Sequence, residues 1–404
     1  MRNLIFISHR IPFPLTKGEK IRAYNLLRHL RQFYRIYLGC VVDDPEDFAH
    51  VPHLREICTE VGAFGINKRV QKLKALASAR PGRPLMPDYY FNPALARWVR
   101  TTMARTKMDI VYVFCGAMMP YAAGLPRRGL ILDMQDIDSE KWALYAGKSG
   151  WPMRAVWARE ARTLLAFERR AALAADATLF VTETEARRFM ELAPEAADRV
   201  DWVEMGVDLE EFSPAHDLPN PYSAEGPHLV FTGNMDYWPN ADAASWFAAE
   251  VLPLLRRRAA ALEFHIVGAN PGPEVRRLAA LPGVQVTGRV PDVRPYVAHA
   301  AVSVSPLRMA RGVQNKVLHA MAMGRPVVAS SQAFEGIRAV AGRDLLVADG
   351  AEATARQVGA VLDGECPGLG AAGRAAVERS YAWEATLARL DAIMERSLRG
   401  RLSA

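Results

Sequence analysis

The sequence has few cysteines, and none of them forms a pair with metal-binding or redox spacing. Its four cysteines, Cys40, Cys58, Cys115 and Cys366, are scattered over 404 residues without a C-x-x-C pair. This distribution argues against disulfides and structural zinc, and it favours a reducing compartment. The nine histidines show no metal-ligand spacing either. We therefore expect no metal and no cofactor.

Long apolar runs are also absent. No segment approaches the roughly 20 apolar residues that cross a bilayer as a helix, and the apolar run at residues 4–7 is too short for a signal peptide. We expect a cytoplasmic protein, and a peripheral position at the inner face of the plasma membrane stays open.

Familiar nucleotide and nucleic-acid motifs are missing. The chain contains neither G-x-x-x-x-G-K-[ST] nor G-x-G-x-x-G, and it has no RNP, zinc-finger or helix-turn-helix signature. The net charge of +7 nevertheless suits anionic partners such as nucleotide phosphates or acidic lipids. Nucleic acid is the weakest of these candidates, and we predict no such partner.

Short apolar runs alternate with helical patterns along most of the chain. We expect strands at residues 4–8, 36–42, 61–66, 110–114, 130–133, 177–181 and 200–203, and again at 229–232, 263–267, 284–287, 301–304, 326–329 and 345–347. Such alternation predicts an α/β fold of two doubly wound, Rossmann-like parallel sheets that face a central cleft.

The chain length suits two domains of roughly 200 residues. We expect an N-terminal domain at 1–210, a proline-rich linker at 211–227, a C-terminal domain at 228–382 and a last helix at 383–404 that packs back on the first domain. Helices are expected at 19–32, 352–362 and 383–398, and a mobile loop at 80–93.

Residues 311–330 carry the clearest signal for a ligand. A glycine-bearing loop leads into Asn315, a favoured N-cap, and Lys316 would lie in the first helical turn. Free backbone N–H groups, the helix dipole and an ammonium together form a site for a phosphate or diphosphate. The alternative is an ordinary surface helix.

Three successive strands of the second domain end in glycine. Gly233, followed by Asn234, closes the first of them, Gly268 the second and Gly288 the third. One such glycine would indicate a turn, whereas three on one edge of a sheet favour a ligand lying along that edge.

In the first domain, residues 17–22 follow the first strand, and Gly18 would let the backbone approach a ligand at a helix start. Taken alone, this segment is also typical of an ordinary βα loop.

Asp133 and Asp136 follow another strand and are candidates for a functional role, although Asp-x-x-Asp is a weak metal signal. Asp138 or Ser139 would cap the next helix.

A helix at residues 151–170 mixes tryptophan with arginine. Trp151, Arg154 and Trp157 suit a surface that lies against anionic lipid. A core helix with a solvated basic face explains the same composition equally well.

The ordered set of motifs resembles the family-4 retaining glycosyltransferases of the GT-B fold, with the closest likeness to the bacterial branch associated with exosortase (PEP-CTERM) exopolysaccharide systems. The resemblance covers nearly the whole chain. It rests on residues 17–22, 133–142, 181–185, 204–208, 231–237, 286–292, 311–324 and 326–328.

The resemblance implies a nucleotide-sugar donor, UDP- or GDP-linked, in the C-terminal domain. It implies these donor-binding residues: Gly18, Arg22, Gly233, Asn234, Gly268, Arg289, Val290, Arg308, Arg311, Gln314, Asn315, Lys316 and His319. Lys316 would pair with the diphosphate, and Arg289 and Val290 would border the base. Asp133, Asp136 and Lys141 would lie on the acceptor side, with Asp136 and Lys316 as the catalytic residues.

The chain departs from the family pattern at two donor-site positions. The family carries two glutamates with seven residues between them, and here Arg311 and His319 stand in their places. A carboxylate at the second position would accept hydrogen bonds from ribose hydroxyls, whereas a neutral imidazole can accept one. An arginine and a lysine usual after the first glycine loop are missing too, which leaves Lys316 and Arg308 for the diphosphate.

The resemblance predicts a metal-independent hexosyltransferase that transfers a sugar, with retention, to an exopolysaccharide or lipid-linked saccharide. His319 motivates an alternative from another class, a catalytically weak GT-B binding or scaffold protein of a polysaccharide assembly complex. A nucleotide-sugar epimerase is less favoured, because its carboxylates are not recognisable.

Overall fold

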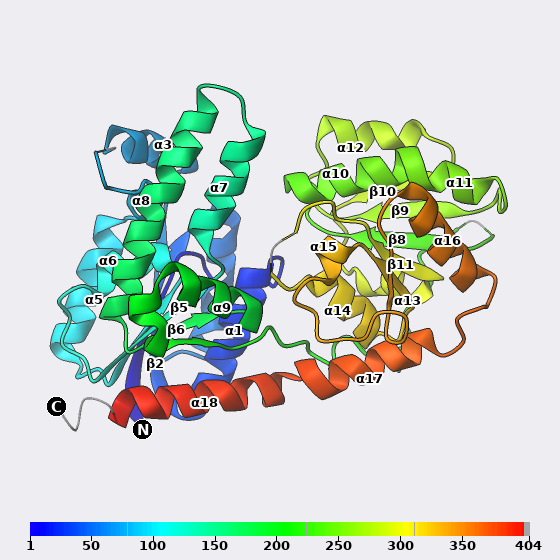
Figure 1. The fold of residues 1–404 in the computed structure, drawn as a ribbon. Coiled ribbons are helices and arrows are strands. Elements are labelled where there is room, and N and C mark those ends of the chain that lie inside the picture. The colour runs from blue at the N-terminus through cyan, green and yellow to red at the C-terminus, as the bar shows by residue number, and fades with distance from the viewer. Residues whose placement is uncertain (79, 224, 311, 400–404) are drawn as a thin grey trace. The chain divides into compact units, whose positions relative to one another are not determined.

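The computed structural model describes residues 1–78, 80–223, 225–310 and 312–399. It divides into two compact units. Unit 1 comprises Met1–Glu204 and the C-terminal segment from Leu387, and unit 2 comprises Met205–Thr386. Each unit is a parallel sheet with helices on both faces (Figure 1).

Unit 1 contains a seven-stranded sheet in the order β3-β2-β1-β4-β5-β6-β7. Its strands are β1 Arg2–Ser8, β2 Tyr34–Val42, β3 Glu60–Gly65, β4 Ile110–Phe114, β5 Gly129–Gln135, β6 Ala177–Phe180 and β7 Val200–Trp202. The central strand β1 pairs in parallel with β2 on one side and β4 on the other. Burial on both faces explains why these strands are continuous apolar runs.

The helices of unit 1 fill the connections between these strands. They are α1 Gly18–Leu30, α2 Val51–Arg55, α3 Lys68–Ala77, α4 Met86–Tyr89, α5 Pro93–Arg105, α6 Met119–Ala122, α7 Asp138–Lys148, α8 Met153–Ala174 and α9 Glu183–Leu192. Short 3-10 turns lie at Pro45–His50, Gly116–Met118 and Pro194–Arg199.

Unit 2 contains a six-stranded sheet in the order β10-β9-β8-β11-β12-β13. Its strands are β8 His228–Thr232, β9 Glu263–Val267, β10 Val284–Gly288, β11 Val302–Ser305, β12 Val327–Ala329 and β13 Leu346–Val347. Its helices are α10 Trp238–Trp246, α11 Leu252–Arg256, α12 Pro273–Arg277, α13 Arg294–His299, α14 Asn315–Ala322, α15 Ser331–Phe334, α16 Ala351–Leu362 and α17 Leu369–Tyr381, with a π-helical turn at Phe247–Val251 and a 3-10 turn at Leu278–Ala280.

The structure confirms the two parallel α/β sheets and a strand at each of the thirteen expected positions. It also contains α17, which the sequence reading missed because its start is rich in glycine. A Cβ at Gly370 would lie 2.0 Å from the carbonyl oxygen of Gly324, just after α14. Glycine is therefore needed here for close packing of a helix and does not mark a loop.

The last helix, α18 (Trp383–Arg399), continues along unit 1 from Leu387. Arg389 lies over the Trp202 ring at 3.5 Å and pairs with Asp201 at 2.6 Å. Asp391 contacts His29 at 2.7 Å. The apolar side of the helix, with Leu390, Ile393 and Met394, is buried.

Residues 80–93, which were expected to form a mobile loop, contain the short helix α4. Hydrogen bonds join this segment to α8. Both carboxylate oxygens of Glu160 accept hydrogen bonds from the backbone N–H of Leu85, at 2.8 and 2.9 Å. One of them also accepts from Met86 at 3.0 Å. A carboxylate from a neighbouring helix thus satisfies the backbone donors at the start of α4.

The start of α7 is capped in the same way, which corrects the prediction that Asp138 or Ser139 is the cap. Ile137 occupies the N-cap position without a side-chain bond. Glu168 of α8 instead accepts from the backbone N–H of Ser139 at 3.1 Å and from its hydroxyl at 2.5 Å. Burial raises the pKa of Glu168 to about 8.

Candidate functional site

The connections in unit 2 reverse direction between two neighbouring strands. From β8 the chain builds outward to β9 and β10, whereas β11 starts the other side of the sheet with β12 and β13. In open α/β sheets, ligands bind at the carboxyl ends of the strands beside such a reversal. The loops that follow β8 and β11 therefore define the candidate site.

The three strand-end glycines lie side by side at this edge. The backbone N–H of Gly233 donates to Val267 at 3.0 Å, and that of Gly268 donates to Gly288 at 3.1 Å. Gly268 has a φ of +152°, and a Cβ there would lie 1.7 Å from the carbonyl oxygen of Gly233. No other residue fits at Gly268 without moving the loop after β8.

Lys316 lies in the first turn of α14 and reaches toward this loop. Its ammonium donates to Oδ1 of the buried Asn240 at 2.5 Å and lies 4.7 Å from the centre of the Phe231 ring. Asn240 in turn donates to the carbonyl of Asn234 at 2.9 Å. Burial lowers the pKa of Lys316 to about 7, and no carboxylate counteracts this shift.

The start of α14 differs by one residue from the prediction. Gln314 is the N-cap, and Asn315, which was expected there, is the first helical residue. The Gln314 side chain donates to the carbonyl of Gly312 at 3.2 Å and makes no cap bond to the helix. Within the described residues, the first turn of α14 thus lacks a side-chain cap, which leaves room for an anion at its backbone N–H groups.

His319 lies one turn after Lys316, on the same side of α14. Its ring stacks on Phe212 with centroids 3.8 Å apart and an angle of 12° between the planes. Burial lowers its pKa to about 4, so the imidazole is neutral near pH 7. A neutral ring offers one N–H and one lone pair to hydroxyl groups.

Of the two arginines predicted for the donor site in unit 2 that the structure describes, one is paired with a carboxylate and the other is exposed. Arg308 is half-exposed and holds Asp242 of α10 through two nitrogens, with Nε 2.9 Å from Oδ2. A diphosphate would have to compete with that carboxylate. Arg289 is exposed at the end of β10, next to the partly buried Val290. Arg311 lies outside the described residues.

In unit 1, the side chains of Arg22 and Asp133 contact each other in the interior. Their side chains are 1% and 0% exposed, and Arg22 Nη2 lies 3.0 Å from Asp133 Oδ2. Tyr112 donates to the same oxygen at 2.8 Å, and Arg22 also donates to the carbonyl of Val203 at 2.6 Å. The predicted donor contact of Arg22 and the predicted acceptor contact of Asp133 stay predictions, and the structure shows the two residues as a buried ion pair. The pair ties α1 to the sheet.

Gly18 is the first residue of α1, directly after β1 and its loop. The N-cap, Lys17, makes no side-chain cap bond, and burial lowers the pKa of its ammonium. Glu19 pairs with Arg10 at 2.8 Å. This helix start therefore brings Lys17 and the Arg10–Glu19 ion pair to the carboxyl end of β1.

Asp136 and Lys141 lie at the carboxyl end of β5 and in the first turns of α7, and both are partly buried. Between them, burial raises the pKa of Asp138 to about 6, with Lys141 opposing the shift and Asp136 adding to it. The three groups form one electrostatically coupled cluster.

Sequence reasoning missed His9, which follows β1. It is 7% exposed, stacks on Phe114 and makes an edge contact with Tyr90. Burial lowers its pKa to about 4. Its position directly after a buried strand was the available signal. At the same edge, the non-glycine residues Cys115, directly after β4, and Gln135, at the end of β5, have φ of 83° and 71°. Such backbone strain is typical of functional sites.

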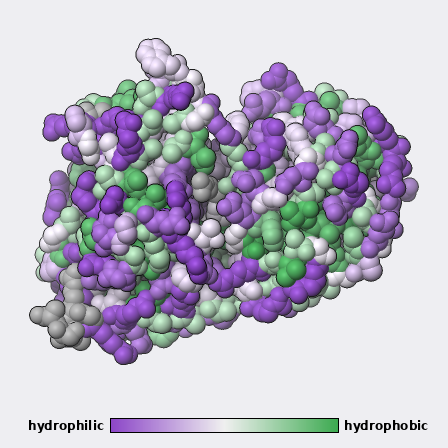
Figure 2. Space-filling model, in the orientation of Figure 1, coloured by the Kyte–Doolittle hydropathy of each residue, from purple (hydrophilic) through white to green (hydrophobic). Residues whose placement is uncertain are grey.

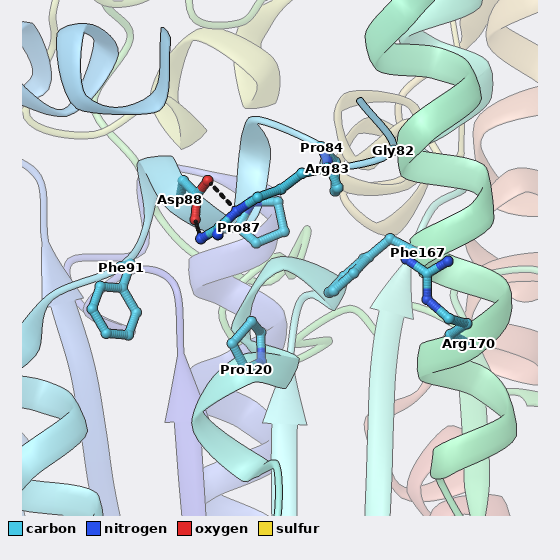
Figure 3. Close-up of a pocket in the computed structure, with 9 residues that line it drawn as sticks. All are labelled: Gly82, Arg83, Pro84, Pro87, Asp88, Phe91, Pro120, Phe167 and Arg170. Atoms are coloured by element: carbon cyan, nitrogen blue, oxygen red, sulfur yellow. Dashed lines mark hydrogen bonds and ion pairs between the residues drawn. The ribbon is translucent and has the colours of Figure 1, made fainter. Parts of the chain in front are cut away.

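A pocket of about 410 Å³ lies elsewhere in unit 1, and no predicted site residue lines it (Figure 3). Its wall is formed by the segment before and within α4, by α6 and by α8. The lining residues are Gly82, Arg83, Pro84, Pro87, Asp88, Phe91, Pro120, Phe167 and Arg170. The bond from Arg83 Nε to Asp88, at 2.8 Å, closes one side.

The chain has the GT-B fold of two Rossmann-like domains. It is similar to sucrose-phosphate synthase from Thermosynechococcus elongatus, with 16% identity, a TM-score of 0.73 and coverage of 98% of this chain and 99% of that chain. HepE from Anabaena, in complex with UDP and glucose, has 13% identity, a TM-score of 0.68 and coverage of 98% and 100%.

Residues 226–364, which include the strand-end glycines and Lys316, match the family model described as "Glycosyl transferases group 1". The lipopolysaccharide outer core galactosyltransferase WaaB is a further similar structure, with 14% identity, a TM-score of 0.58 and coverage of 97% and 99%. Among curated proteins, no sequence matches this chain.

Gly268→Ala should disrupt the edge of the sheet in unit 2. The added Cβ meets the backbone of Gly233, and the conformation alone costs about 1–3 kcal/mol for a non-glycine residue. We expect a lower thermal midpoint in thermal unfolding. Gly272→Ala is the matched control, because its Cβ would lie 3.9 Å from the nearest side chain. Equal behaviour of the two variants would contradict this reading.

Proposed function

We propose that this protein is a retaining, metal-independent family-4 glycosyltransferase. It transfers a hexosyl group from a UDP- or GDP-linked sugar to a saccharide or lipid-linked acceptor in bacterial exopolysaccharide synthesis. The match of residues 226–364 to group 1 glycosyl transferases supports the reaction class. The similarity to HepE, which was solved with UDP and with UDP-glucose, supports a nucleotide-sugar donor.

The observation that carries the proposal is the setting of Lys316. It is the only lysine between residues 205 and 386, where every other permanent cation is an arginine. Its ammonium is desolvated beside a neutral amide, at an uncapped helix start and next to the strand-end glycines. A diphosphate would supply the missing negative charge, and the ammonium would stabilise the nucleoside diphosphate as it leaves.

The remaining groups fit the two ends of such a donor. The loop with Gly233 and Asn234 borders the diphosphate, Arg289 and Val290 border the base, and His319 offers one hydrogen bond to the ribose. On the acceptor side we assign Asp136 and Lys141, whose charges are coupled through Asp138. In a front-face reaction the departing phosphate takes the acceptor's proton, so the mechanism needs no protein nucleophile.

A peripheral membrane position is part of this proposal. In the described residues no helix is both long and apolar enough to cross a bilayer. The tip between α7 and α8 exposes 87% of Trp151 and 40% of Met153, beside the exposed Arg154. Hydrophilic side chains dominate the face shown in Figure 2, with apolar ones in small groups. The Trp157 ring, in contrast, packs against Trp142 of α7, with ring centroids 4.7 Å apart, and so connects the two helices.

A scaffold protein of a polysaccharide complex is the second candidate. His319 favours it, because the ring stands where the family has a carboxylate and is covered on one face by Phe212. A scaffold with this fold would bind no nucleoside diphosphate at the Lys316 site.

Lys316→Met should weaken UDP binding by roughly 10- to 100-fold, the loss of one charge-assisted hydrogen bond. The wild-type affinity for UDP should be highest below pH 7 and fall above it, by up to about tenfold per pH unit. The reason is that UDP binds the protonated form of Lys316, and above its pKa of about 7 the free protein must first take up a proton. Calorimetry between pH 6 and 9 measures both effects. The UDP affinity of Lys316→Met should no longer depend on pH in this way. Arg257→Met, which removes an exposed cation, should keep the pH dependence of the wild type. Unchanged UDP affinity in Lys316→Met would refute the assignment of the donor site.

His319→Glu should restore a carboxylate that accepts two ribose hydroxyls, with Lys316 one turn away to offset its charge. We expect up to about tenfold tighter UDP binding, and about tenfold weaker binding in His319→Ala, each the size of one hydrogen bond. Calorimetry with UDP and GDP checks this. Absence of any nucleoside diphosphate binding in the wild type would favour the scaffold.

Trp151→Ala should reduce sedimentation with phosphatidylglycerol vesicles at low salt. Binding of the wild type should fall at high salt, because exposed charges are screened. Phe33→Ala, which removes an aromatic ring that is 50% exposed elsewhere in unit 1, is the control. If the wild type and Trp151→Ala sediment equally, the hairpin tip is not a membrane contact.

A further inference from the structure

Two histidines and a glutamate converge at the amino end of the sheet in unit 2. His228 is the first residue of β8, and Glu263 is the first residue of β9 and its pairing partner. His265 follows two residues later on the same strand. Because side chains alternate along a strand, all three project from one face of the sheet. This edge is opposite to the one with Gly233 and Gly268.

The three side chains bring their ligand atoms to one point. His228 Nδ1 lies 3.2 Å from His265 Nε2, His265 Nε2 lies 3.1 Å from Glu263 Oε2, and His228 Nδ1 lies 3.5 Å from the same oxygen. A tetrahedral zinc ion with bonds of about 2.0–2.1 Å separates its ligands by roughly 3.4 Å. The triangle of ligand atoms already has this size.

Hydrogen bonding alone does not explain why His228 Nδ1, His265 Nε2 and Glu263 Oε2 lie so close together. The Nε2 atom of His265 faces two partners, the imidazole nitrogen of His228 and the carboxylate of Glu263. A ring nitrogen carries either one proton or one lone pair, so it can satisfy only one of them well. A cation at the centre accepts a lone pair from all three atoms at once.

Groups around the triangle hold it in place. The Tyr222 ring stacks on His228 with centroids 4.1 Å apart and contacts His265 at 4.5 Å. Its hydroxyl donates to the carbonyl of Tyr296 at 2.5 Å and so points away from the ligand atoms. Gln285 of β10 lies 3.5 Å from the other oxygen of Glu263. Such outer contacts orient metal ligands.

We propose that His228, Glu263 and His265 form a binding site for a divalent transition metal, with zinc as the ion that fits best. Two imidazoles and one carboxylate are a donor set that zinc prefers, and the fourth position would hold water. Both histidines are 6% exposed, so the ion would be largely covered.

The location indicates a structural role. The metal would connect the start of β8 to the start of β9. The Tyr222 ring packs against both of its histidine ligands. The metal lies at the far end of the strands from the Lys316 site, roughly 13 Å along a five-residue strand. The metal site therefore does not depend on the proposed glycosyltransferase reaction and would fix the spacing of the two strands that carry its glycine loops.

Co²⁺ is the probe for this site, because a tetrahedral Co²⁺ complex has intense visible bands. After treatment with EDTA and dialysis, the full-length protein should bind one equivalent of Co²⁺ with this spectrum, and one equivalent of Zn²⁺ should displace it. Zn²⁺ should also raise the thermal midpoint, as a ligand of the native state does.

His265→Gln should lower the affinity by more than about 100-fold, since it removes a ligand rather than an outer-shell contact. Glu263→Gln is the second variant, at a partly exposed position that better tolerates substitution, and circular dichroism establishes that each variant is folded. His216→Gln, an exposed histidine of the same unit, should bind like the wild type. The proposal is overturned if the wild type gives no tetrahedral Co²⁺ spectrum, or if both folded ligand variants keep it.

Discussion

The parallel direction of every strand pair is the constraint from which the rest of the molecule follows. Parallel pairing sends all carboxyl ends of a sheet to one edge and all amino ends to the other. In unit 2 the first edge collects the glycine loops and the start of α14, and the second collects His228, Glu263 and His265. One sheet thus presents two chemically different edges, one suited to an anion and the other to a cation.

Much of the fold could be predicted from the sequence, because a buried parallel strand is a continuous apolar run whose ends are marked by turn residues. The shared edge of Gly233, Gly268 and Lys316 followed from the same pattern. The sequence could not predict which side chains contact each other when strand pairing brings distant parts of the chain together. Arg22 and Asp133, for example, are 111 residues apart in the sequence and form an ion pair in the interior.

Helix starts show the same limit at a smaller scale. Local rules assign a cap to a polar residue beside the first turn, yet α4 and α7 take their caps from carboxylates of α8. Ser139 has the right chemistry for a cap and instead donates to Glu168. The start of α14 lacks such a substitute within the described residues, which distinguishes it from those two helices and agrees with a helix start that receives an external anion.

The low pKa of Lys316 has a consequence outside binding. Because burial lowers the pKa of Lys316 to about 7, more of its side chains carry a free amine near neutral pH than in an exposed lysine. An uncharged amine is a nucleophile, whereas a protonated one is not. Unit 2 has no other lysine. Its candidate site therefore contains one amine that can react with acylating reagents, and a bound anion would lower that reactivity because it favours the protonated ammonium.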